Sequence, residues 1–105
     1  MDVIANLEAM LDRGDDGAML RFALGNEYLK SSETEAAIRH LSVAVDLDAD
    51  YSAAWKQLGK AQVEAGLDNQ AAESFERGIE VAERCGDQQA AKEMRVFLHR
   101  LNKKL

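Results

Sequence analysis

Three carboxylates alternate along residues 46–50, a spacing that could hold a calcium ion. Asp46, Asp48 and Asp50 would take positions 1, 3 and 5 of a calcium-binding loop. Such a loop also needs a glycine at position 6 for its sharp turn and a bidentate glutamate at position 12. Tyr51 and Gln57 occupy those two positions. Because half of the ligand set is missing, the sequence predicts an acidic turn before a helix and not a metal site.

The other residue types that carry chemistry are few and scattered. His40 and His99 lie far apart in the sequence, and Cys85 is the single cysteine, so neither a zinc-ligand spacing nor a cysteine pair is present. No Gly-rich phosphate loop, nucleophile elbow or paired nucleophile and base occurs either. We therefore predict a protein that is not an enzyme and that uses no metal and no cofactor. A metal-dependent hydrolase is the least favoured hypothesis.

The charge of the chain argues against nucleic acid as a partner. The formal net charge is −6, with 11 acids and 4 bases in residues 1–50 and 8 acids and 9 bases in residues 51–105. Nucleic-acid binding needs a basic face to meet the phosphates. The basic residues near the end of the chain either form a local patch or complement the C-terminal end of a last helix; they are Lys92, Arg95, Arg100, Lys103 and Lys104.

Hydropathy gives no sign of a membrane span or a leader peptide. Nowhere do 18 apolar residues run together, and the first residues combine an acid with amphipathic spacing in place of a basic, continuously apolar leader. The sequence predicts no membrane partner and a cytoplasmic protein. Its 105 residues, 47% of them hydrophobic, are enough for one domain with a modest core.

The elements that must position any site are helices. The chain has no proline and is rich in Ala, Leu, Glu, Lys, Arg and Gln, whose side chains lose little freedom in a helix. Helices are predicted at about 2–13, 17–31, 34–47, 51–65, 68–84 and 87–103, which makes an all-α fold of about six helices. Ser32 with Glu35 predicts a capping box for the third helix, and Asp50 or Ser52 predicts a cap for the fourth.

An internal repeat organises these helices. Gly25 and Gly59 are 59 − 25 = 34 residues apart, and their surroundings repeat with them. The matched pairs are Leu24 with Leu58, Ala37 with Ala71, Leu41 with Phe75, and Val45 with Ile79. A glycine inside a helix costs about 1 kcal/mol relative to alanine, so we predict that each one allows close approach between the two helices of its unit. Ala37 and Ala71 are the expected small partners.

The period and the residues at these offsets resemble the tetratricopeptide repeat, a helix–turn–helix unit of 34 residues. Residues 52–85 supply Trp55, Leu58, Gly59, Ala71 and Phe75, followed by Gly78; residues 18–51 supply Leu24, Gly25, Tyr28, Ala37, Leu41 and Ala44. Arg21 replaces the tryptophan of the pattern in the first unit. The resemblance implies an α-solenoid in which the two units are flanked by an N-terminal helix and turn (1–16) and a C-terminal capping helix (86–105). The capping helix has the spacing of a second-type helix.

The resemblance also implies a concave groove lined by the first helix of each unit. Carried over by offset, the groove residues are Met19, Phe22, Asn26, Leu29 and Lys30 in the first unit and Lys56, Lys60 and Val63 in the second, with Ala53 and Glu64 beside them. Apolar side chains next to lysines suit a peptide with an apolar anchor and an acidic group or C-terminal carboxylate. In the alternative, the leading helix covers the apolar residues and the lysines are simply solvated.

Two functions therefore follow from the sequence. The first is a protein–protein interaction scaffold that binds a peptide or helix of a partner protein in the concave groove. The second is self-association into a homo-oligomer through the end helices, because solenoid ends with apolar residues can stack or exchange helices.

Overall fold

The computed structural model describes residues 2–104 and contains six helices, with no strand among those residues. The helices are α1 (Val3–Asp12), α2 (Ala18–Lys30), α3 (Thr34–Leu47), α4 (Ser52–Glu64), α5 (Asp68–Arg84) and α6 (Gln88–Lys104). Every predicted helix is present with ends within a few residues of those expected. The all-α prediction is confirmed.

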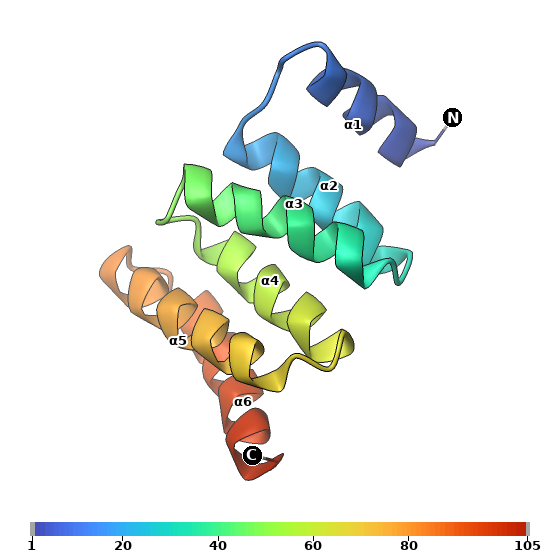
Figure 1. Cartoon of the computed structure of the whole chain (residues 1–105). Coiled ribbons are helices and arrows are strands. Elements are labelled where there is room, and N and C mark those ends of the chain that lie inside the picture. The colour runs from blue at the N-terminus through green and yellow to red at the C-terminus, as the bar shows by residue number, and fades with distance from the viewer. Residues whose placement is uncertain (1, 105) are drawn as a thin grey trace.

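The helices form a stack of antiparallel neighbours (Figure 1). Each helix packs against the next one along the chain, and α2 also contacts α4 while α4 contacts α6. Thus α2, α4 and α6 form one layer, and α3 and α5 form the other. The stack measures 41 × 28 × 20 Å, with α1 and α6 at its two ends. This is the α-solenoid expected from the repeat.

Close helix approach explains the two repeated glycines. A Cβ atom added to Gly25 would lie 2.4 Å from Cγ of Leu41, and one added to Gly59 would lie 2.5 Å from the Phe75 ring. Such distances are below van der Waals contact, so any side chain here would force the two helices of the unit apart. The closest partners are Leu41 and Phe75, not the predicted Ala37 and Ala71.

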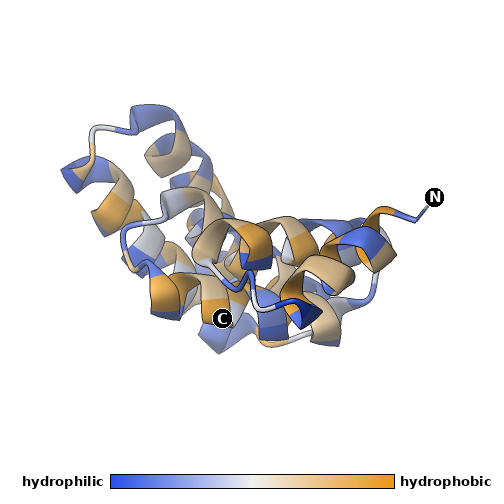
Figure 2. Ribbon diagram, turned by 90° about the horizontal axis from the view of Figure 1, so that it is seen from above, coloured by the Kyte–Doolittle hydropathy of each residue, from blue (hydrophilic) through white to orange (hydrophobic). Residues whose placement is uncertain are grey.

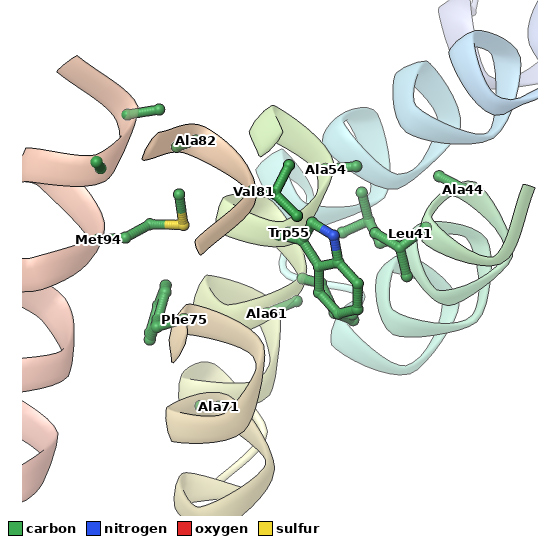
Figure 3. Packing of buried hydrophobic residues seen from close by; sticks show 14 of the residues in the cluster. Leu41, Ala44, Ala54, Trp55, Ala61, Ala71, Phe75, Val81, Ala82 and Met94 are labelled. Atoms are coloured by element: carbon green, nitrogen blue, oxygen red, sulfur yellow. The ribbon is translucent and has the colours of Figure 1, made fainter. Parts of the chain in front are cut away.

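Buried apolar side chains fill the space between the layers, and polar residues lie on the outer surfaces (Figure 2). In Figure 3, Trp55 lies between Leu41 and Val81, so it joins the two units. Its indole N–H donates to the carbonyl of Ala49 at 2.9 Å. Met94 of α6 points toward α5, where Gly78 leaves room for its sulfur atom. The core therefore runs continuously from the first unit to α6.

Backbone closure replaces the side-chain caps that the sequence suggested. Gly66 adopts φ +78° and Ser32, 34 residues earlier, adopts φ +60°. At both sites the following amide bonds back to the preceding helix: Glu33 to the Tyr28 carbonyl at 2.9 Å, and Leu67 to the Gln62 carbonyl at 2.8 Å. Ser32 is thus committed to ending α2 and cannot cap α3.

The predicted caps are wrong for α4 as well. Neither α3 nor α4 has a side-chain hydrogen bond at its N-cap position. Asp50 pairs instead with Arg84, and the Ser52 hydroxyl donates to Asp87 at 3.2 Å. Both side chains tie the start of α4 to the distant α5–α6 region. Long-range contacts have displaced the local ones.

The place of α6 also differs from the expectation. Its apolar spacing resembles that of a second helix, yet it lies beside α4 as α4 lies beside α2. It therefore occupies the position of the first helix of a third unit. The physical reason is topological, because consecutive antiparallel helices alternate between the two layers and α6 follows α5.

Candidate functional site

A cavity of about 470 Å³ opens on the layer formed by α2, α4 and α6. We call it the groove cavity. Its lining residues are Asn26, Leu29, Lys30, Gln57, Lys60, Val63, Glu64 and Phe97. This volume is within the range of small-ligand pockets and is enough for one or two side chains of a bound peptide.

Helical spacing places these residues on one surface. Asn26, Leu29 and Lys30 are three and four positions apart on α2, so they share a face, and Lys60, Val63 and Glu64 do the same on α4. Leu29, Val63 and Phe97 supply the apolar part of the wall. The polar part includes a hydrogen bond between the helices, in which Nε2 of Gln57 donates to Oδ1 of Asn26 at 2.8 Å.

The structure brings five of the eight predicted groove residues together in this cavity: Asn26, Leu29, Lys30, Lys60 and Val63. Lys56 lies next to them but is engaged by α6, with Nζ at 2.9 Å from Oε1 of Glu93. Met19 lies outside the cavity with 78% of its surface exposed. Phe22 packs on Tyr51 with ring centroids 4.8 Å apart and is partly buried.

The leading helix is fastened elsewhere. Among the described residues, α1 contacts α2 and no other helix. The Tyr28 hydroxyl donates to Oε2 of Glu8 at 2.7 Å, a bond that raises the pKa of Tyr28. Tyr28 and Phe22 are six positions apart, roughly 120° around α2. Because α1 docks at Tyr28, Leu29 stays available to line the groove cavity.

Sequence reasoning missed Phe97 and Gln57. The ring of Phe97 stacks on that of Phe75, with centroids 5.3 Å apart, while Lys60 Nζ lies 5.9 Å from its centroid. Phe97 belongs to α6, which has no counterpart in the 34-residue repeat, so no offset pointed to it. Gln57 had a usable signal, because it follows Lys56 directly on the groove-facing side of α4.

A second polar cluster joins the first unit to α1. His40 is 3% exposed, its Nδ1 lies 3.1 Å from an Arg21 nitrogen, and its ring stacks on Tyr28. Arg21 in turn holds Asp16 through two nitrogens, at 2.8 and 2.9 Å. Burial lowers the pKa of His40, so its neutral ring is the acceptor for Arg21. Every member of the cluster is spent on packing the helices together.

Two searches of residues 2–104 gave empty results. They contain no group of three or more His, Cys, Asp or Glu side chains placed to hold a metal ion. None of the helices that these residues form is long and apolar enough to cross a membrane.

Comparison with known proteins identifies the family. A TPR repeat-containing protein of Pseudomonas aeruginosa, PA0015, is 46% identical over 101 residues, covering 96% of each chain. The chain belongs to the tetratricopeptide-repeat (TPR) family. No family model matches it. The predicted TPR resemblance is confirmed.

Solved structures agree with this assignment. The solution structure of protein BPP2914 from Bordetella parapertussis has a TM-score of 0.85 and 42% identity, covering 99% of this chain and 90% of that one. A TPR domain protein from Salinibacter ruber has a TM-score of 0.75 and 27% identity, covering 82% and 87%. The TPR fold supports a protein-interaction module in general, and TPR proteins are generally non-enzymatic scaffolds.

Proposed function

We propose that this TPR protein is a non-enzymatic scaffold that binds a short segment of a partner protein in the groove cavity. The observation that carries the proposal is the cavity itself. It presents Leu29, Val63 and Phe97 as an apolar wall, with Lys30 and Lys60 among the lining residues. An apolar anchor with an acidic group nearby is the complementary ligand.

Charge favours such a segment. Lys30, Lys60 and Glu64 give the cavity lining a formal charge of +1, whereas the whole chain carries −6. A locally positive groove on an acidic protein would attract an acidic segment there and repel it elsewhere. The volume limits the buried part of the ligand to one or two side chains, so the interaction is a short contact and not a long wrapped peptide.

Affinity capture from the native cell extract tests the proposal. A groove variant, Leu29→Glu with Val63→Glu, places carboxylates in the apolar wall of the cavity. A matched control, Glu76→Lys with Glu80→Lys, changes as many exposed charges on α5, which lies in the other layer. The partner should be retained by the wild type and the control and be lost by the groove variant.

Circular dichroism and thermal unfolding must first show that both variants are folded. Loss of the partner from the α5 variant with retention by the groove variant would contradict the proposal and place the interface on the other layer.

A further inference from the structure

A second cavity adjoins the groove cavity at its α6 side. It has a volume of about 260 Å³ and lies between α4 and α6. Lys60 and Phe97 line both cavities, so the two meet at these side chains. The remaining lining residues are Lys56, Glu93, Val96 and Arg100. We call this cavity the α4–α6 corner.

The corner carries more positive than negative charge. Three cations, Lys56, Lys60 and Arg100, line it together with one carboxylate, Glu93. Glu93 is held by Lys56 at 2.9 Å, and a Gln89 amide nitrogen lies 3.4 Å from its other oxygen. Arg100 is exposed and forms no ion pair with any other residue between 2 and 104. The formal charge of the lining is therefore +2 in a chain of −6.

We propose that the α4–α6 corner is the subsite for a carboxylate of the bound segment, with Arg100 and Lys60 as its cationic contacts. Glu93 is the internal carboxylate that holds Lys56 when no ligand is bound. This proposal rests on the proposed function of the groove. It adds that recognition of charge depends on α6, which lies outside the two repeats.

The position of the corner sets the chemistry of the ligand. Because Lys60 and Phe97 belong to both cavities, the apolar anchor and the carboxylate come from adjacent residues, or from one C-terminal residue. The Lys56 ammonium lowers the pKa of Glu93, so this side chain is ionised at neutral pH and competes with the ligand. Glu93 thus weakens the binding of acidic segments and makes it selective for those that supply a well-placed carboxylate.

Two blocked tripeptides provide the test: acetyl-Phe-Glu-Glu-amide and its uncharged analogue acetyl-Phe-Gln-Gln-amide. Each is titrated into the ¹⁵N-labelled full chain, and the amide shifts of α4 and α6 give the dissociation constants. The acidic peptide should bind more tightly. Surface ion pairs contribute up to about 1 kcal/mol, so Arg100→Gln should weaken it about threefold, and Glu93→Gln should strengthen it by about the same factor.

Lys103→Gln is the matched control. This residue is exposed on the same helix and lines neither cavity. Its substitution removes the same charge as Arg100→Gln and should leave the affinity of the acidic peptide unchanged at physiological salt, where distant surface charges are screened.

The possible failures are distinguishable. Equal affinities of the two peptides, with shifts in the groove cavity, would overturn the carboxylate subsite and leave the groove function standing. Equal weakening by Arg100→Gln and Lys103→Gln would also overturn the subsite, because only net charge would then matter. Absence of shifts at both cavities for both peptides, with the captured partner bound elsewhere, would overturn the subsite and the groove function together.

Discussion

The two repeats share a backbone but differ in how they use the same buried position. In the second unit, the Ser74 hydroxyl donates to Oε1 of Gln62 at 2.6 Å, and both side chains are buried. The residues 34 positions earlier are His40 and Tyr28, which are stacked aromatic rings. The Gln62–Ser74 pair is complete in itself. The Tyr28–His40 pair extends to α1 through Glu8.

A second position makes the same contrast. Trp55 packs between the two units, whereas Arg21, its counterpart in the first unit, binds Asp16 and contacts His40. The second unit is therefore bordered by an apolar contact and the first by a polar network. The lesson is that glycine and large apolar residues fix the solenoid, while the polar positions adapt to whichever helix lies next to the repeat.

The largest expected effect is loss of the side chain that fills each glycine notch. Phe75 and Leu41 are both fully buried, so Phe75→Ala should cost about 3–5 kcal/mol and Leu41→Ala about 2–5 kcal/mol of the free energy of unfolding. Urea denaturation measures both. Val96→Ala, at an exposed site on α6, should change stability by less than about 0.5 kcal/mol. Similar losses at Val96 and Phe75 would refute this view of the core.

Adding a methyl group at the notch tests the same contact from the other side. Gly59→Ala should destabilise the protein by about 1–3 kcal/mol, because the new Cβ would overlap the Phe75 ring. Helix propensity alone predicts a gain of about 1 kcal/mol, so even the sign of the change is informative. Thermal unfolding of Gly59→Ala beside Glu76→Ala, an exposed change on α5, gives the comparison.

The polar network of the first unit should make stability depend on pH. Burial lowers the pKa of His40 in the folded state, so below pH about 6.5 the unfolded chain binds a proton that the folded chain does not. The stabilisation is therefore complete above pH about 6.5 and is lost as the pH falls from there toward the folded pKa. For one proton the slope is at most about 1.4 kcal/mol per pH unit.

Substitution of each histidine isolates this contribution. His40→Gln should flatten the pH dependence of the urea midpoint between pH 7 and 5. His99→Gln, at an exposed position on α6, should leave it as in the wild type. If His99→Gln flattened the curve and His40→Gln did not, the network would not be the source of the effect.

The smallest expected effect concerns the turn that ends the first helix of each unit. Ser32 holds the left-handed conformation that Gly66 holds in the second unit. Ser32→Gly should stabilise the protein by about 0.5–1 kcal/mol, and Gly66→Ser should destabilise it by about the same amount. Both residues are exposed, so packing does not obscure the result. A loss of stability on Ser32→Gly would show that the serine side chain does more than turn the chain.

Much of this fold could be predicted from the sequence because the repeat reports on packing. The 34-residue spacing of Gly25 and Gly59 identified the close approach of two helices, and helix composition did the rest. What could not be predicted are contacts between segments distant in sequence. Asp50 and Ser52 looked like local caps, but their partners Arg84 and Asp87 come from α5 and the α5–α6 turn.

The groove shows the same division. The repeat offset brought Asn26, Leu29, Lys30, Lys60 and Val63 to one cavity, because each offset fixes a helix face. Phe97 was missed because α6 lies outside the repeat and its side chains have no offset to inherit. The tie between Lys56 and Glu93 was missed for the same reason. Periodicity predicts the faces of the repeats but not the surface of a helix that closes them.

The central claim is that the partner binds in the groove cavity, and site-specific photo-crosslinking tests it most directly. A photoreactive amino acid is placed at Lys30, an exposed residue that lines the groove cavity, and separately at Glu76, an exposed residue on α5. Irradiation in the cell extract should give a covalent adduct with the captured partner from position 30 and none from position 76. An adduct from position 76 alone would contradict the account, because the partner would then bind the opposite layer of the solenoid.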